Sequence, residues 1–174
     1  MHPLPKHLRG VVSPAEAQEE NCVEGKVVCT CKRDEFSLMY PGQTHEYDGQ
    51  VIPCTVEIGG NFFFILRADC LNCQNQHLLF DSHLHGWNGF ICHEEERARL
   101  PRPALVAWKC LECGGVGHKL DIRINGESQE EFEENAGEEY GLDAWPEAFG
   151  WISVSVSCTT CGKRTDDLVS YESM

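Results

Sequence analysis

Apolar and polar positions alternate along much of the chain, which predicts β-strands with one face buried. Residues 118–124 place leucine or isoleucine at every second position, and residues 151–157 alternate isoleucine or valine with serine. The apolar run 61–69 has the length of a fully buried strand. Shorter segments of strand character lie at 25–40, where a turn interrupts them, and at 51–58, 77–81, 104–109 and 167–171.

Helical spacing is clear in one segment, residues 128–140. Phe132, Ala136 and Tyr140 recur every four residues, while Ser128 and Glu131 form the pattern of a capping box. Seven glutamates between 127 and 140 cover the other faces. A second capping-box pattern, Ser-Pro-Ala-Glu at 13–16, predicts a short helix in the N-terminal segment. Together the two periodicities predict an α+β fold that is rich in β-structure, with one acidic amphipathic helix.

Eight of the eleven cysteines occur in close pairs, each at the turn between two predicted strands. Two such turns facing each other supply the four thiolates of a tetrahedral metal site. Glycine follows the second cysteine at 114 and 162, where a turn of this kind often needs a positive φ. We therefore predict two structural zinc ions with these ligands: Cys29, Cys31, Cys70, Cys73, Cys110, Cys113, Cys158 and Cys161.

The cellular context inferred from the sequence favours metal over disulfides. The cysteine count is odd, the N-terminal residues lack the apolar segment of a secretory signal, and no apolar run approaches the roughly 18 residues that span a bilayer. We therefore expect a cytoplasmic protein, in a compartment that keeps thiols reduced. The three remaining cysteines, Cys22, Cys54 and Cys92, are expected to be small buried residues.

Two of the cysteine segments, Cys-Leu-Glu-Cys-Gly at 110–114 and Cys-Thr-Thr-Cys-Gly at 158–162, resemble the zinc knuckles of the zinc-ribbon class. Cys29/Cys31 with Cys70/Cys73 resembles a more divergent ribbon. The resemblance implies structural zinc between antiparallel hairpins. The chain departs from the usual pattern in its first pair, which is Cys-x-Cys, and in the gaps of 38 and 44 residues between paired knuckles.

Four pairs can form two sites in three ways. We favour neighbours in sequence, the first pair with the second and the third with the fourth, because shorter loops cost less closure entropy. The difference is only about 0.6 kcal/mol per doubling of loop length. This pairing predicts a flexible N-terminal arm at 1–21, a first knuckle lobe at 22–85, a connection at 86–103 and a second lobe at 104–174. Iron remains an alternative metal, since four thiolates also bind it.

The charge of the chain restricts its partners. The formal net charge is −14 at pH 7, and each four-thiolate zinc site would add −2, which brings the total to about −18. Nucleic acid and anionic membranes are disfavoured, because phosphate binding needs clustered Lys and Arg. We expect instead a protein-interaction module of adaptor or immunity type, with a basic protein partner. Its contact surface would combine the acidic helix with the aromatic segment 143–151, unless Trp145 and its neighbours close the core.

Two alternatives remain open. Asp81, His83 and His85 are spaced as ligands on one strand face, with His93 and the three glutamates of 94–96 nearby, and this favours a metal-dependent hydrolase. The cysteines at 29, 31, 70 and 73 resemble the zinc-thiolate arrangement of a redox-regulated heat-shock chaperone, which implies a redox switch. The sequence has no Gly-rich phosphate loop or nucleophile elbow, so a non-catalytic role is favoured over an enzyme.

Overall fold

A computed structural model describes residues 2–16, 19–91 and 99–173 of the chain. Within them it contains thirteen strands, one helical segment at 129–140 and several shorter 3-10 or π-helical turns, which confirms the prediction of a β-rich α+β fold. The named strand pairs are all antiparallel. No helix among these residues is long and apolar enough to cross a membrane.

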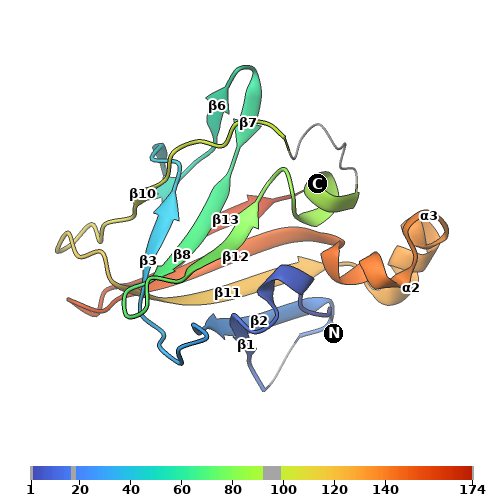
Figure 1. The fold of residues 1–174 in the computed structure, drawn as a ribbon, viewed down its shortest axis with the longest axis horizontal. Coiled ribbons are helices and arrows are strands. Elements are labelled where there is room, and N and C mark those ends of the chain that lie inside the picture. Colours follow the sequence, from blue (N-terminus) through green and yellow to red (C-terminus); the bar gives the residue numbers. More distant parts are fainter. Residues whose placement is uncertain (1, 17–18, 92–98, 174) are drawn as a thin grey trace.

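The largest sheet has nine strands and two halves (Figure 1). One half has the order β1-β2-β11-β12-β13, with bounds Val12–Pro14, Cys22–Val27, His118–Gly126, Phe149–Cys158 and Arg164–Glu172. The other has the order β10-β3-β8-β9, with bounds Val106–Ala107, Phe36–Tyr40, Ile65–Cys70 and Gln76–Asp81. A single residue pair, His118 opposite Phe36, joins β11 to β3 and thereby connects the halves.

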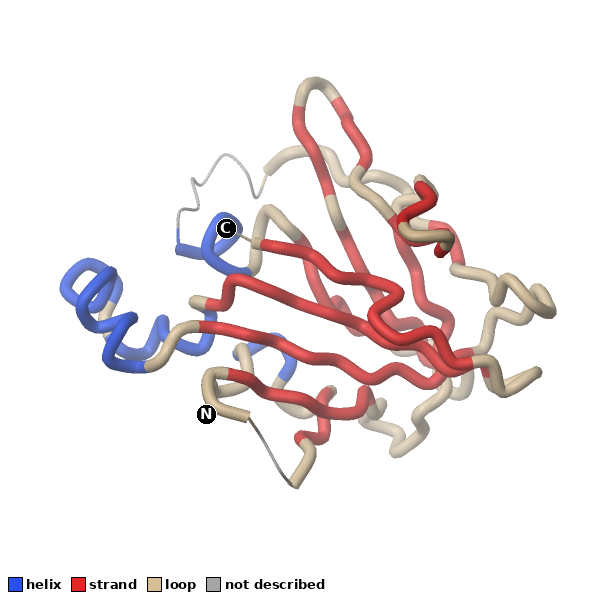
Figure 2. Tube along the Cα trace, turned by 180° about the vertical axis from the view of Figure 1, so that it is seen from behind, coloured by secondary structure: helices blue, strands red, loops and turns tan. Residues whose placement is uncertain are grey.

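The two halves pack on each other and enclose the main core. Figures 1 and 2 show β3 and β8 crossing β11, β12 and β13 at a steep angle, so the sheet is folded over itself. Their inward side chains form one hydrophobic cluster that includes Leu66, Phe80, Ile122 and Val154. These side chains occupy the alternating apolar positions of the sequence, so the predicted periodicity marks the buried face.

The strands of the two predicted lobes interleave in this sheet. β11, from the range 104–174, lies beside β2 from the range 22–85 and also contacts β3. The sheet therefore does not divide at the boundaries predicted for the lobes, and both ranges share one core. The connection 86–103 is described only in part; it begins with a π-helical turn, Trp87–Ile91.

The N-terminal segment packs against the rest of the protein. His2 and Leu8 are fully buried, and a short 3-10 turn covers Lys6–Leu8. The helix predicted at 13–16 is wrong: Val12–Pro14 forms strand β1, where Ser13 lies opposite Lys26 of β2. Pairing with β2 and burial of Val12 outweigh the local capping pattern.

The predicted acidic helix is confirmed. It runs through α2 (Gln129–Phe132), a π-helical turn (Glu133–Gly137) and α3 (Glu138–Tyr140), and Ser128 and Glu131 form the expected capping box. Phe132 and Ala136 are buried in a second core cluster beside the 3-10 helix Leu142–Glu147, whereas Tyr140 is exposed. The helix lies at the end of the sheet where β11 ends and β12 begins (Figure 1).

Two small hairpins complete the fold. The predicted strand at 51–58 is divided between them, into β5 (Gln50–Pro53), which pairs with β4 (Thr44–Tyr47), and β6 (Val56–Ile58), which pairs with β7 (Asn61–Phe63). The apolar run 61–69 is likewise divided between β7 and β8. The β6–β7 hairpin projects from the folded sheet at the top of Figure 1.

Candidate metal centres

The structure brings the eight paired cysteines together in two groups of four. Within each group all Sγ atoms lie within 4.8 Å of one another. The groups combine neighbours in sequence, as the loop-closure argument favoured. The first cluster consists of Cys29, Cys31, Cys70 and Cys73, and the second cluster of Cys110, Cys113, Cys158 and Cys161.

All four cysteine turns have the same backbone geometry. The N–H of the residue after the second cysteine donates to the carbonyl of the first cysteine, and the N–H of the first cysteine donates to the carbonyl of the second residue beyond the pair. These eight donor–acceptor distances lie between 2.8 and 3.0 Å. Each turn is therefore a knuckle that holds two sulfurs on the same side, although the first pair is one residue shorter.

The residue that follows each knuckle adopts a left-handed conformation, with φ of 68° at Lys32, 65° at Gln74, 73° at Gly114 and 76° at Gly162. Glycine accepts this φ without strain, whereas other L-residues pay roughly 1–2 kcal/mol. The sequence indicated the positive φ only at the two glycines. The other two knuckles are of the same type, and their lysine and glutamine gave no sign of it.

Only two of the knuckles are hairpin turns. Cys70/Cys73 lies between the paired strands β8 and β9, and Cys158/Cys161 lies between β12 and β13. The other two knuckles lie in loops between strands that do not pair with each other, β2 and β3 for Cys29/Cys31 and β10 and β11 for Cys110/Cys113. The prediction of four hairpins is wrong for these two, because β2 and β3 each pair with β11 instead.

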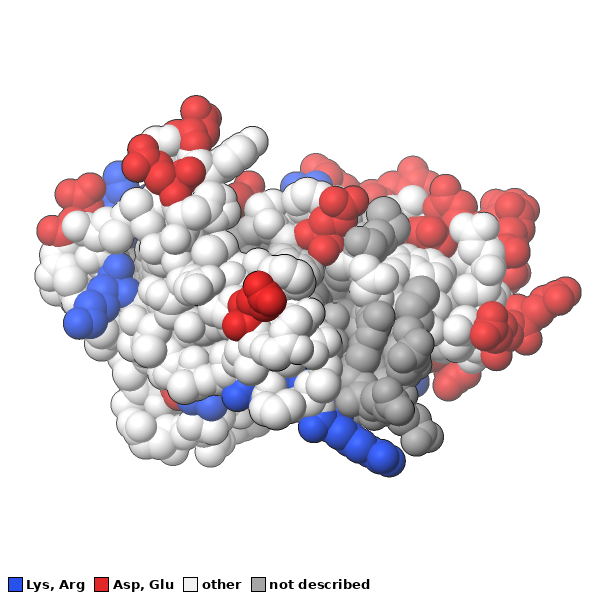
Figure 3. Space-filling view, turned by 90° about the horizontal axis from the view of Figure 1, so that it is seen from above, with Lys and Arg blue, Asp and Glu red and all other residues white. Residues whose placement is uncertain are grey.

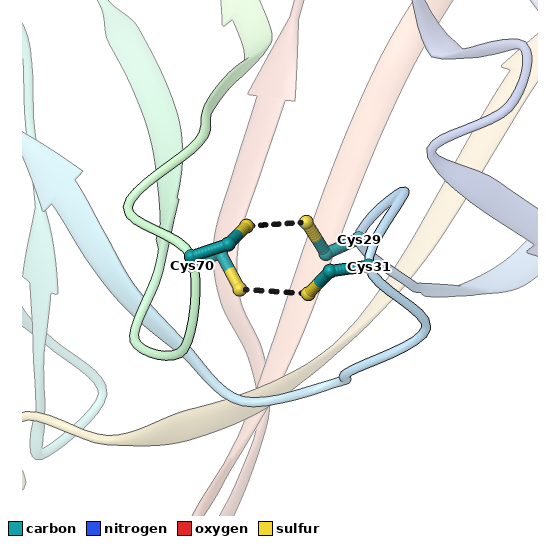
Figure 4. Close-up of side chains that lie close together, drawn as sticks. Cys29, Cys31 and Cys70 are labelled. Atoms are coloured by element: carbon teal, nitrogen blue, oxygen red, sulfur yellow. Dashed lines mark hydrogen bonds between the residues drawn. The ribbon is translucent and has the colours of Figure 1, made fainter.

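The sulfur positions fit a tetrahedral metal ion. Four sulfurs at the usual Zn–S distance lie about 3.8 Å apart along each edge of the tetrahedron. The closest Sγ pairs between facing knuckles are 3.4 and 3.7 Å apart in the first cluster and 3.6 and 3.6 Å in the second. A disulfide would require roughly 2.05 Å, and all of these cysteines are free. Figure 4 shows Cys29 and Cys31 facing Cys70 across the first cluster.

The thiols of each cluster resist ionising together. Burial raises the pKa of Cys31, but hydrogen bonds from a backbone amide and from the other three thiols outweigh burial and bring it to about 6. A backbone amide lowers the pKa of Cys73, but burial and the other three thiols raise it to about 12. Cys158 and Cys113 divide in the same way, at about 6 and about 12. A bound cation would offset the repulsion between four thiolates held this close together, so the ligand set fits a divalent metal.

Polar side chains approach the sulfurs of the first cluster. His77 Nε2 lies 3.2 Å from Cys29 Sγ, and Asn72 Nδ2 donates to Cys31 Sγ at 3.7 Å. In the second cluster the Gly115 N–H donates to Cys113 Sγ at 3.4 Å. The sequence analysis did not identify His77, whose position four residues after Cys73 and at the start of the returning strand was the available sign.

Both clusters lie at one end of the sheet. Cys70 is opposite Phe36, Cys158 is opposite His118, and Phe36 and His118 are opposite each other, so the clusters flank the pair that joins the two halves. The hydroxyl of Thr159, inside the fourth knuckle, donates to Glu35 Oε1 at 2.6 Å, next to β3. The clusters are thus neighbours at the corner of the folded sheet, opposite the acidic helix.

The basic residues beside the cysteines pair with carboxylates. Lys163 Nζ lies 3.9 Å from Glu112 Oε1. Arg164 bonds to Asp121 at 2.5 Å and to Asp166 at 2.6 Å. These carboxylates therefore offset part of the positive charge beside the second cluster.

Asp81, His83 and His85 do not come together as a metal site; among the described residues, only the two cysteine clusters bring three or more ligand atoms within 4.8 Å of one another. β9 ends at Asp81, and its carboxylate binds Arg102 Nε at 2.7 Å and accepts from the His83 N–H at 2.8 Å. His83 Nε2 lies 2.7 Å from the Phe62 carbonyl, and His85 Nδ1 accepts from the Asp81 N–H at 3.0 Å. The three ligand atoms are thus engaged elsewhere. His93 and residues 94–96 lie outside the described residues.

Among the described residues, the cysteines outside the clusters and Trp145 lie mainly in the protein interior. Cys22 is fully buried and Cys54 is half-buried, while Cys92 lies outside the described residues. Trp145 packs against the second core cluster and donates its Nε1–H to the Glu127 carbonyl at 3.0 Å. The reading of Trp145 as part of the core is therefore favoured, whereas Trp151 is 38% exposed.

Comparison of the chain with protein-family models, with curated proteins and with solved structures found no match to any of them.

Proposed function

We propose that this protein binds two structural zinc ions, one in each cysteine cluster. The observation that carries the proposal is the convergence of eight cysteines, from four knuckles with the same two backbone hydrogen bonds, into two groups whose sulfurs lie within 4.8 Å of one another. Zinc is favoured over other divalent ions because structural sites built only from cysteine thiolates are typical of it.

Each zinc ion would cross-link an inter-strand loop to a hairpin turn at one end of the sheet. The first cluster connects the β2–β3 loop to the β8–β9 turn, and the second connects the β10–β11 loop to the β12–β13 turn. In small zinc domains, binding to such sites contributes about 10–16 kcal/mol of apparent free energy, much of which is spent on ordering the ligands. A cytoplasmic location, as we propose, would keep these eight thiols reduced and able to bind metal.

The test is elemental analysis of the native protein, with thiol titration before and after chelation. We expect two zinc ions per chain and eight additional reactive thiols once the metal is removed. A colourless protein supports zinc, whereas iron bound to four thiolates would absorb in the visible range. Absence of any metal, with the cysteines oxidised in pairs, would refute the proposal.

We further propose that the helical end of the molecule binds a basic protein partner. No Lys or Arg occurs between Arg123 and Lys163, whereas nine carboxylates do. Figure 3 shows acidic side chains gathered over the end that carries α2 and α3. Leu142 is 49% exposed within this acidic surface and supplies an apolar contact. In a typical interface, charged groups attract the partner at long range, and a few apolar groups at the centre are buried on binding.

The partner proposal is tested by purifying the untagged protein from its source and identifying what remains bound by mass spectrometry. The affinity of the purified partner is then compared between wild type and a variant with Glu130, Glu134 and Glu138 changed to glutamine. A matched control changes three carboxylates of β13, Asp166, Asp167 and Glu172. We expect at least a tenfold weaker affinity for the helix variant alone. Equal affinity for both variants, or an acidic partner, would exclude this surface.

A further inference from the structure

The two cysteine clusters differ in how far their sulfurs reach solvent. In both, the first cysteine of each knuckle is buried, with exposed fractions of 1% for Cys29, 0% for Cys70, 7% for Cys110 and 3% for Cys158. The second cysteines differ: Cys31 and Cys73 are half-buried, whereas Cys113 and Cys161 are exposed. The second cluster is therefore the more open of the two to a reagent in solution.

We propose that the second cluster is a modification site for hydroperoxides, at which oxidation releases its zinc ion, while the first cluster retains its metal. This inference rests on the proposed function, because it requires zinc in both clusters. It also differs from the expectation from sequence, which placed a redox switch at the first cluster.

The turns around the second cluster leave the approach open. A Cβ atom placed on Gly114 or Gly162 would have no neighbour within 4 Å, so the space beside these two glycines is open. The corresponding positions of the first cluster carry the longer side chains of Lys32 and Gln74. Access to the metal-bound sulfur limits the rate of attack on a reagent, so the second cluster is expected to react first.

Hydrogen bonds also distinguish the clusters. His77 and Asn72 place side-chain nitrogens 3.2 and 3.7 Å from two sulfurs of the first cluster. A donor that bonds to a thiolate stabilises its negative charge and makes the sulfur a weaker nucleophile. The second cluster has the Gly115 backbone N–H at 3.4 Å from Cys113 Sγ. Its exposed sulfurs are thus both more accessible and less stabilised by side chains.

The reaction is balanced as follows. A thiolate of Cys113 or Cys161 attacks one oxygen of hydrogen peroxide, the O–O bond breaks, and sulfenic acid and hydroxide form. A second thiolate attacks that sulfur and displaces another hydroxide, which leaves a disulfide. Overall, two thiolates lose two electrons, the peroxide gains them and becomes two hydroxides, and Zn²⁺ passes to water. The remaining pair of thiolates no longer suffices as a tetrahedral site.

The geometry identifies the disulfides formed. Cys161 Sγ lies 3.6 Å from Cys110 Sγ, and Cys113 Sγ lies 3.6 Å from Cys158 Sγ. Each exposed sulfur thus faces a buried sulfur of the opposite knuckle and must approach it to about 2.05 Å. A disulfide of this kind joins the same two knuckles that zinc joined. Oxidation is therefore expected to release zinc while the fold is retained.

The experiment treats the zinc-loaded full chain with limiting hydrogen peroxide. Released zinc is followed with a colorimetric chelator, and the cysteines are mapped by differential alkylation and mass spectrometry. We expect one zinc ion per chain to be released at least tenfold faster than the other, with Cys110–Cys161 or Cys113–Cys158 disulfides and an unchanged far-UV circular dichroism spectrum. Prior elemental analysis separates the two proposals, since a chain without two zinc ions fails the proposed function before oxidation begins.

The exposed Asn72 offers a matched variant, Asn72→Ala, which removes one donor from the first cluster and leaves the second unchanged. We expect zinc release from the first cluster to become severalfold faster in this variant, with no change at the second. Faster oxidation of Cys29, Cys31, Cys70 or Cys73 in the wild type, equal rates at both clusters, or no release from either zinc-loaded cluster would overturn the inference. If zinc release from the first cluster is no faster in Asn72→Ala, the hydrogen bond from Asn72 does not protect this cluster.

Discussion

Replacing His85 by asparagine is expected to remove a large part of the acid sensitivity of the fold. His85 is 8% exposed, and its ring is stacked on that of His7 at 3.6 Å between centroids. Its Nδ1 accepts from the Asp81 N–H, so a proton at that nitrogen would break the bond. Burial, together with the neighbouring His7, lowers the pKa of His85 from 6.5 to about 3. Glu147 Oε2 lies 3.9 Å from His7 Nδ1, but burial outweighs its charge, so the pKa of His7 is also lowered.

The size of the effect follows from linkage. Because the folded-state pKa lies below the unfolded value of 6.5, protonation of His85 favours the unfolded chain. Its contribution to stability is complete above about pH 6.5 and is lost, by about 1.4 kcal/mol per pH unit, as the pH falls toward 3. Between pH 7.0 and 5.5 this amounts to about 1 kcal/mol. Asparagine can accept the Asp81 N–H bond but does not titrate in this range.

The assay is urea unfolding of wild type and His85→Asn at pH 7.0 and 5.5 with zinc present. The asparagine variant has its own constant cost from the smaller side chain, so the quantity compared is the change in unfolding free energy between the two pH values. We expect this change to be about 1 kcal/mol smaller in the variant, with the zinc content unchanged. Identical changes in both proteins, or a His85 pKa near 6.5 by NMR, would refute the reasoning. Loss of a metal ion in the His85→Asn variant would instead indicate that this histidine is a metal ligand.

Three further substitutions test the local geometry by thermal or urea unfolding. Gly114→Ala places a Cβ at a φ of 73° without a steric contact and should lower the unfolding free energy by about 1 kcal/mol. Gly137→Ala lies in the helical segment, where the nearest contact of the new Cβ is 3.5 Å, and should raise the unfolding free energy by up to about 1 kcal/mol. A change of the same sign in both variants would contradict the assigned conformations. Ser128→Ala removes the helix cap and should cost about 1 kcal/mol, with a loss well below this indicating that the helical segment depends on packing alone.

The secondary structure was largely predictable from the sequence, because it follows from the local periodicity of apolar residues. Residues 118–124 and 151–157 alternate so regularly that the inward face of β11 and β12 could be identified in advance. The capping box of Ser128 and Glu131 likewise fixed the start of the helix, since both hydrogen bonds are made within four residues. The same pattern at Ser13 failed, because long-range pairing of β1 with β2 is not visible in local sequence.

The candidate sites show the same division between local and distant information. Cysteine spacing was sufficient to predict knuckles, and loop-closure entropy favoured the clusters that the structure shows. Cysteine spacing was insufficient to predict which strands flank the knuckles. The reason is that β11 lies beside both β2 and β3 through contacts that span about ninety residues of sequence. The alignment of Asp81, His83 and His85 assumed that the strand continues, whereas β9 ends at Asp81 and turns each side chain to a different partner.

The position of the clusters indicates what bound metal would contribute at this end of the fold. The two halves of the sheet are joined by one residue pair, His118 with Phe36, and a single pair cannot fix the angle at which two sheets cross. At the far end, aromatic contacts such as Phe80 with Phe149, at 6.2 Å between centroids, hold the halves together. At the corner the strands turn into knuckles, whose polar and exposed residues supply little apolar surface. Two metal ions on either side of the joining pair would supply there the constraint that packing supplies elsewhere. Removal of both ions should therefore loosen the corner before the aromatic end, and hydrogen exchange at β3 and at the start of β11 would report that order.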